Sequence, residues 1–154
     1  MKFDNLGVYA RNDEVESKIG VDVEFPNGIT ITILRAGGSN HKYSRAIRKY
    51  LTPSILRKID AGVISQDDED KLWAEIYADG IVTDFKGVMS GGKDVPYSRD
   101  AVVALLVASP QMLKDLRETA DKLMTFRQEE NKEEAKNLGN SSNGDSSGGS
   151  LKKG

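Results

Sequence analysis

Apolar and polar residues alternate in two segments near the start of the chain, Val21 to Phe25 and Ile29 to Ile33. A turn signature, Pro26 to Gly28, separates the two segments. Because successive side chains of a strand point to opposite faces, the valines and isoleucines lie on one face of the pair. The pattern predicts a β-hairpin over residues 21–34 that buries this face against the rest of the chain, since an isolated hairpin is only marginally stable.

Beyond the hairpin, apolar residues recur every three or four positions, which is typical of helices that bury one side. This spacing predicts two short helices, over 42–51 and 53–60. Thr52 and Pro53 mark the boundary between them, because threonine caps helices and proline is favoured at the first helical position.

A longer helix is predicted to start at Ser65, where Ser65 and Asp68 have the spacing of a capping box. Its apolar stripe runs as far as Phe85. The stripe includes Trp73, the only tryptophan of the chain, which we expect near the centre of the core.

The segment from Ala101 to Ala108 has almost no polar face, so we expect it to be packed on most sides. Ser98 is predicted to cap this helix, and Ser109 with Pro110 to start the last one. Together the elements predict an α+β fold that is mainly α-helical, with an N-terminal β-hairpin packed on a bundle of about four to five helices.

Composition divides the chain of 154 residues into three parts. Residues 1–20 lack sustained periodicity and are expected to form a loosely ordered arm. Residues 21–136 are expected to form a single globular domain, with the hairpin at 21–34 and the helices within 42–136. Residues 137–154 are rich in Gly, Ser and Asn and have little to bury, so a flexible, disordered tail is predicted there.

The composition also argues against several classes of function. The chain has no cysteine and a single histidine, which leaves no thiolate nucleophile, no disulfide and no cysteine- or histidine-based metal cage. The formal net charge of -2 gives no general attraction for nucleic acid or anionic membranes, and no segment is long and apolar enough to span a bilayer. We therefore expect a cytoplasmic protein that is not an enzyme and uses no cofactor or metal.

Three local motifs have both a chemical and a simpler interpretation. Gly87 to Asp94 has the glycine and lysine spacing of a phosphate-binding loop, but Asp94 stands where such a loop has Ser or Thr. A phosphate-binding loop also follows a strand and leads into a helix, whereas here a helix is predicted before the segment and none directly after it. A Gly-rich turn is therefore favoured. The acidic run Asp67 to Asp70 fits a helix N-terminus better than a cation site. His41 lies in a polar turn without a nucleophile to activate, which favours a solvated or turn-capping role.

Basic residues gather between positions 35 and 58, interleaved with Tyr43 and Tyr50. The patch could contact phosphate, but the acidic stretch that follows could neutralise it, and its spacing matches no nucleic-acid motif. Contact with a protein or pairing within the fold is therefore favoured. The candidate residues of this patch are Arg35, Lys42, Arg45, Arg48 and Lys49.

The order of features from about Asp68 to Asn137 carries a family resemblance. The features are the segment Leu72 to Val88, a Gly-rich turn, Val95 to Asp100, the apolar run 101–106, the helix begun by Pro110, the later Ala120, the Phe126-Arg127 pair and the charged run ending in Lys136-Asn137. This order resembles the tail assembly chaperones of long-tailed, siphovirus-type bacteriophages. The segment 21–62 is similar less specifically, and Phe85 stands where that family is expected to have Trp.

The resemblance implies a non-enzymatic factor that works in the host cytoplasm. Such a factor binds the tape measure protein, keeps it soluble, helps to recruit tail tube subunits and is absent from the mature virion; whether this chain also self-associates stays open. A helical client of this kind fits helix-in-groove binding to exposed apolar residues. The candidate partner-binding residues are Met112, Leu116, Leu123, Met124 and Phe126, which could alternatively close the domain's own core.

Many members of that family also make a longer product by a −1 ribosomal frameshift near the end of the short reading frame. The segment Leu151 to Lys153 is compatible with the slippery heptamer A-AAA-AAG if the leucine codon ends in A. Two other classes compete with the chaperone. One is a small structural tail or connector protein of the virion, and the other is a nucleic-acid-binding regulator that uses the basic patch.

Overall fold

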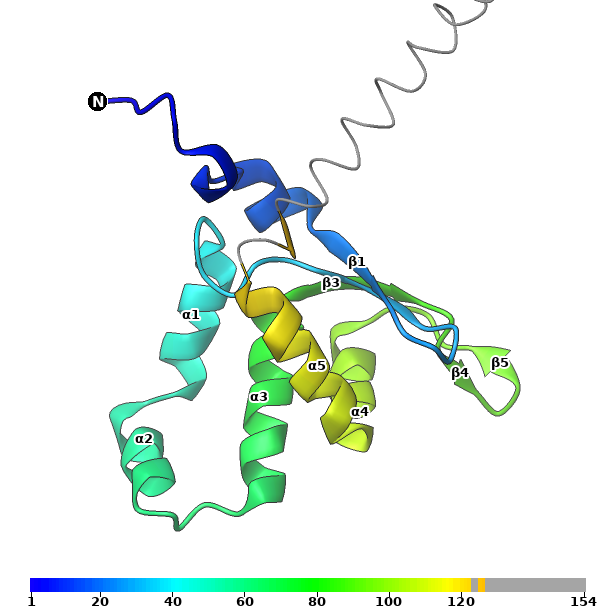
Figure 1. Cartoon of the computed structure of the whole chain (residues 1–154). Helices are drawn as coiled ribbons and strands as arrows, with labels where there is room; N and C mark the ends of the chain where they lie inside the picture. The colour runs from blue at the N-terminus through cyan, green and yellow to red at the C-terminus, as the bar shows by residue number, and fades with distance from the viewer. Residues whose placement is uncertain (123–124, 127–154) are drawn as a thin grey trace, which may run out of the picture.

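The computed structural model describes residues 1–122 and 125–126, so the predicted tail at 137–154 and residues 127–136 lie outside the described part of the chain. Figure 1 shows a small antiparallel sheet at one side of a group of helices. The sheet has the order β1-β2-β3, from β1 (Val21–Glu24), β2 (Thr30–Ile33) and β3 (Val82–Lys86). The helices are α1 (His41–Tyr50), α2 (Pro53–Asp60), α3 (Gln66–Gly80), α4 (Arg99–Ala108) and α5 (Pro110–Asp121). The predicted α+β fold dominated by helices is confirmed.

The predicted hairpin is present as β1 and β2, with Val21 opposite Ile33 and Val23 opposite Ile31. The shared apolar face also forms as expected, since Ile31 and Ile33 are buried. The predicted hairpin is therefore confirmed, and the structure adds its register.

A third strand, β3, was missed, because the helical stripe was extended through Phe85. The structure ends α3 at Gly80 and places Phe85 opposite Ile31 on β2. The hairpin alone would leave the far edge of β2 with unpaired N–H and C=O groups, and pairing with β3 satisfies them. The β-branched residues Val82 and Thr83 suit this extended conformation.

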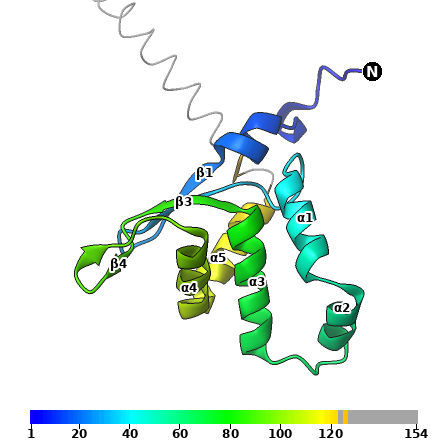
Figure 2. The ribbon, with the colours of Figure 1, turned by 180° about the vertical axis from the view of Figure 1, so that it is seen from behind.

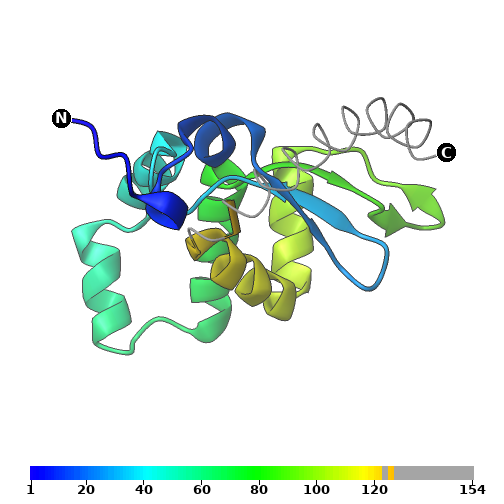
Figure 3. The same cartoon turned by 45° about the horizontal axis from the view of Figure 1, so that its top comes forward.

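The helix α3 is the central element of the fold, with α1 packed along one side and α4 along the other. Both Figure 1 and Figure 2 show α5 crossing over α3 and α4, and Figure 3 shows the sheet beside the helical layer. Within the described residues, no helix is both long and apolar enough to cross a bilayer.

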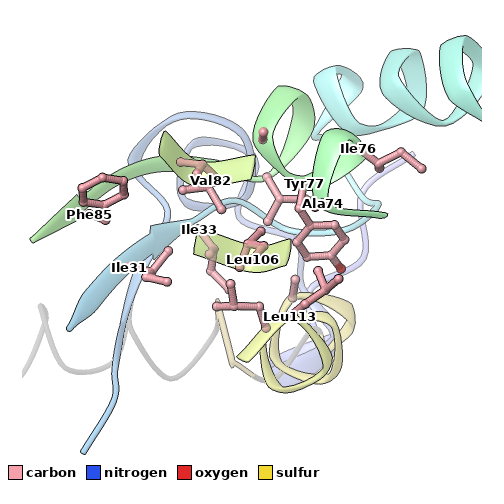
Figure 4. Close-up of a cluster of buried hydrophobic side chains, with 14 of the residues drawn as sticks. Ile31, Ile33, Ala74, Ile76, Tyr77, Val82, Phe85, Leu106 and Leu113 are labelled. Atoms are coloured by element: carbon pink, nitrogen blue, oxygen red, sulfur yellow. The ribbon is translucent and has the colours of Figure 1, made fainter. Parts of the chain in front are cut away.

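The core lies where the sheet meets α3, α4 and α5. In Figure 4, Ile31, Ile33 and Val82 from the sheet face Tyr77 of α3 and Leu106 of α4. These side chains are almost completely shielded from solvent. Their contacts explain why the hairpin needs the helices as a cover.

Trp73 is not at the centre of this core, contrary to expectation. Its side chain is only half-buried, on the α3 surface beside α5, and the guanidinium of Arg117 lies 3.8 Å from the centre of its ring. Tyr77, one turn further along α3, takes the central place. Helical periodicity predicted which residues share a face but not which turn of that face meets the sheet.

The helix α4 is also less enclosed than its apolar sequence predicted. Val102 and Leu106 are buried, whereas Ala104, Val107 and Ala108 are exposed. Packing on α3 and α5 covers only one side of α4, because no further layer lies over its outer face among the described residues.

The helix caps agree with the sequence. The hydroxyl oxygens of Thr52, Ser65, Ser98 and Ser109 each accept a hydrogen bond from an amide three residues later. At Ser65 the structure shows the first of the two bonds of the predicted capping box.

The Gly-rich turn after β3 is confirmed as a small hairpin, formed by β4 (Met89–Ser90) and β5 (Lys93–Asp94). Gly91 and Gly92 between them have φ values of 56° and 77°, a region that glycine enters without a side-chain clash. One part of the argument against a phosphate loop was wrong, because β3 rather than a helix precedes Gly87. The following β4–β5 hairpin still offers no helix N-terminus at this turn.

The expected loosely ordered arm differs from the structure over its second half. A 3-10 turn (Gly7–Tyr9) is followed by a π-helical turn (Val15–Ile19), in which Val15 and Glu16 are buried. The carboxylate of Glu16 lies 2.6 Å from the Arg35 guanidinium, and its carbonyl accepts the Arg35 amide at 3.0 Å. The ion pair joins the arm to the segment after β2, which a pattern search for apolar residues could not reveal.

We predict that Glu16→Ala destabilises the domain by about 3 kcal/mol, because it leaves the largely buried Arg35 without its carboxylate. The control is Arg11→Ala, since the Arg11–Asp13 pair is exposed and contributes about 0 to 1 kcal/mol. Urea unfolding of both variants measures the difference. Equal, small effects would mean that the arm is not an integral part of the domain.

Candidate functional site

The predicted partner-binding surface on the last helix is not open. Met112, Leu116 and Phe126 are buried, with exposed fractions of 7%, 0% and 1%. Leu123 and Met124 lie outside the described residues. These three residues lie in the domain's own core, Met112 and Leu116 because α5 packs across α3 and α4, and Phe126 in the segment that follows α5.

The helix α2 offers apolar surface instead. It has no buried residue, although Thr52 caps it and Pro53 begins it. Leu56 is 43% exposed, and Val63, just after the helix, is 71% exposed. In Figures 1 and 2 α2 stands at the edge of the molecule, beside the first half of α3.

The apolar residues around α2 are only partly covered because α2 packs extensively against no other described element. Within α2, Ile55, Leu56 and Ile59 follow helical spacing and lie on one side of the helix. We call these three residues, together with Leu51 before the helix and Val63 after it, the α2 stripe.

A groove runs along α5 on the side that faces α1. One hollow of about 350 Å³ lies between Tyr43 of α1, Tyr77 of α3 and the α5 residues Lys114 and Arg117. A second hollow of about 330 Å³ lies near the start of α3, by Gln66, and shares Lys114 and Arg117 with the first. We call the two together the α5 groove.

Two tyrosines, Tyr43 and Tyr77, form one wall of the first hollow of the α5 groove. Tyr77 contacts Tyr43 and Trp73 edge to face, with ring centres 6.4 Å and 6.5 Å apart. Arg117 covers Trp73 from the α5 side. Charged residues at the rim, including Glu118 and Asp121, complete an amphipathic surface with an aromatic wall and a polar border.

The tyrosine hydroxyls of this wall stay protonated at neutral pH. Burial raises the pKa of Tyr77, and the neighbouring Tyr43 adds to the effect. Burial likewise raises the pKa of Tyr43, while Arg117 opposes the shift. Neither group is therefore prepared to act as a base, and both can donate hydrogen bonds.

The candidate basic patch is divided by the fold. Arg35 belongs to the buried pair with Glu16 and lies apart from the other four. Lys42, Arg45, Arg48 and Lys49 are all exposed along α1. Only Lys49 of these four has a carboxylate nearby in the described structure, at 3.6 Å from Asp79.

A polar cluster links α1, α3 and α4. Asp79 accepts hydrogen bonds from Arg99 Nε at 2.7 Å and from the Tyr50 hydroxyl at 2.6 Å. Arg99 also reaches the Tyr50 oxygen at 2.9 Å and pairs with Glu75. Burial would raise the pKa of Asp79, but the bonds from Arg99 and Tyr50 outweigh it and lower that pKa. The cluster is a structural clamp that orients the walls of the groove.

Sequence analysis found α2 but missed its role as an open surface. Its isoleucines and leucine have the same spacing as the apolar residues of a buried helix. The sequence of a helix does not show how closely other elements pack against it.

No three His, Asp or Glu side chains within the described chain are grouped so that they could hold a metal ion. His41 is exposed at the first position of α1.

The fold defines a small α+β protein whose helical half carries uncovered apolar surface. Residues 38–137, well over half of the chain, match the family described as YdaY prophage protein, which makes this a protein of phage origin. The chain belongs to the YdaY prophage protein family. No curated protein and no solved structure matches it.

We predict that Asp79→Asn lowers the melting temperature at pH 7 and flattens its pH dependence in acid. Because the folded-state pKa of Asp79 lies below its ordinary value of 3.8, its contribution is present above that pH and is lost as pH falls through the folded pKa. Thermal unfolding from pH 7 to pH 3 tests this. Asp94→Asn is the control, since Asp94 on β5 is exposed and has no ion pair among the described residues, and matching profiles for the two variants would contradict the clamp.

Proposed function

We propose that this prophage protein is a tail assembly chaperone that binds the tape measure protein, keeps it soluble and helps to recruit tail tube subunits. It acts without catalysis, in the host cytoplasm, and leaves before the virion is complete. The short chain is one of two products if its gene carries a −1 frameshift near the end. The phage family and the resemblance over 68–137 support the proposal.

The observation that carries the proposal is the uncovered α2 stripe. A helix of eight residues without one buried side chain gains little from the core, so its apolar residues are better explained by a partner. A client helix that lies along the α2 stripe would bury leucine, isoleucine and valine side chains on both partners. The α5 groove, with its aromatic wall and charged rim, offers a second amphipathic surface on the same helical half.

The dimensions suit a helical client. Eight residues of α helix rise about 12 Å, so the stripe covers roughly two turns of a partner helix. A contact of about two turns is too short for tight binding at a single site. A long client can bind many copies of a small chaperone, however, and weak contacts allow the chaperone to dissociate. A weak, repeated contact therefore fits a factor that departs after assembly.

A small structural tail or connector protein would use the same surface but remain in the particle. Mass spectrometry of purified virions separates the two, because a chaperone is absent from them. A peptide that continues past residue 154 in another frame would support the frameshifted form.

We predict that Leu56→Ser with Val63→Ser weakens binding to the tape measure protein of the same phage at least tenfold. Each buried Leu or Val contributes about 1.5 to 3 kcal/mol, and 1.4 kcal/mol is a factor of ten. Stability should change by less than about 0.5 kcal/mol per substitution, since both residues are exposed. Soluble yield of the co-expressed client and pull-down with the purified chain provide the measurements.

The matched control is Met89→Ser with Val107→Ser, which removes two other exposed apolar side chains on β4 and α4. This control should bind as the unaltered chain does. If the control loses binding and the α2 variant keeps it, the client surface lies on α4 instead. If the unaltered chain neither binds nor solubilises the client, the chaperone function itself is wrong.

A further inference from the structure

The exposed side of α1 carries a row of positive charge. Lys42, Arg45 and Lys49 are spaced three and four residues apart, which places them on one face of the helix. Tyr43 and Ile47, on the other side of the helix, pack against the rest of the fold. The row therefore points away from the core. It lies on a separate surface from the α2 stripe.

The row borders two hollows. The larger, of about 510 Å³, is lined by Ser17, Lys18, Ser39, His41, Lys42 and Arg45, with the buried Asn40 at its base. The smaller, of about 170 Å³, lies between Lys42, Arg45, Lys49 and Asp79. Lys42 and Arg45 border both hollows, and we call the two hollows together the α1 basic depression.

The carboxylates near this depression are already paired. Asp13 pairs with Arg11 at 2.9 Å and accepts from Ser39, and Glu16 pairs with Arg35. Asp79 is held mainly by Arg99 and Tyr50.

Within the described part of the chain, Lys18, Lys42 and Arg45 have no ion-pair partner. Like charges gathered around one depression repel each other, which weakens the fold slightly. An anionic partner would remove that repulsion, so complementary negative charge is the chemistry that the depression fits.

We propose that the α1 basic depression docks an acidic segment of a partner protein. Residues 42 and 49 of α1 are about 10 Å apart along the helix axis, since each residue rises about 1.5 Å. An acidic helix with carboxylates three and four residues apart has the same spacing and can face the row.

A nucleic acid fits the same surface less well. Single-stranded binding sites stack bases on exposed aromatic rings, but Tyr43 faces Tyr77 and Tyr50 is held by Asp79. The row covers only about two helical turns and ends at the carboxylate of Asp79, which would repel a continuing phosphate backbone. A short acidic segment needs no base-stacking surface, and it does not have to continue past Asp79.

The test uses the full chain and a fluorescein-labelled, alanine-based helical peptide with glutamates at positions i, i+3 and i+7. The comparison peptide has glutamine at the same positions. Fluorescence polarisation at pH 7 should show binding of the glutamate peptide that weakens as NaCl rises, because exposed charge pairs are screened. The glutamine peptide should bind at least about tenfold more weakly.

Lys42→Glu with Arg45→Glu should weaken binding of the glutamate peptide at least about tenfold. Arg57→Glu with Lys58→Glu makes the same charge change on exposed positions of α2 and should leave binding within about twofold. Thermal unfolding of both variants shows whether each is folded, and Lys42→Gln with Arg45→Gln provides a milder second variant if the first is not.

Two results would overturn the proposal. One is equal affinity for the glutamate and glutamine peptides. The other is tighter binding of a 20-base-pair DNA duplex or a 20-nucleotide single strand than of the glutamate peptide at the same NaCl concentration, which would make the depression a nucleic-acid site. Neither result bears on client binding by the α2 stripe, because the two surfaces share no residue.

Discussion

The fold depends on the close approach of α1 and α3 at Gly80. A Cβ atom on this residue would lie 2.8 Å from the Tyr43 Cα, so only glycine allows the two helices to meet there. The Gly80 carbonyl also accepts a hydrogen bond from the buried Asn40 side chain, at 2.7 Å. At the same point the chain leaves α3 and turns into β3. The need for glycine at position 80 therefore affects three features at once. These are the packing of α1 on α3, the orientation of α1 and the start of β3.

Two consequences for the surface follow from this junction. It fixes α1 with its aromatic side against Tyr77, which leaves the basic residues facing outward. The helix α2 follows directly after α1 in the chain and does not pack extensively against the core. The clamp around Asp79 stabilises the same arrangement from the α4 side. An apolar surface and a basic surface therefore lie on the same helical half of the molecule.

Much of the fold could be predicted from local signals, because those signals act between neighbours in the chain. Alternation gave β1 and β2, and the caps at Thr52, Ser65, Ser98 and Ser109 gave the helix starts. The candidate site could not be predicted in this way. Met112 and Leu116 have the same side-chain chemistry as Leu56, yet the first two are buried and the third is exposed. Exposure depends on which elements pack together, and a single helical stripe does not contain that information.

The sequence by itself determined the hairpin, the predominance of helix and the helix starts set by Ser, Thr and Pro, since these follow from backbone geometry and short-range hydrogen bonds. Tertiary structure alone decided that residues 82–86 form a strand, that Glu16 is buried with Arg35, and that α2 rather than α5 exposes its apolar side. Each of these depends on contacts between residues far apart in the chain. Such contacts depend on the packing of the whole domain, so a local sequence pattern does not predict them.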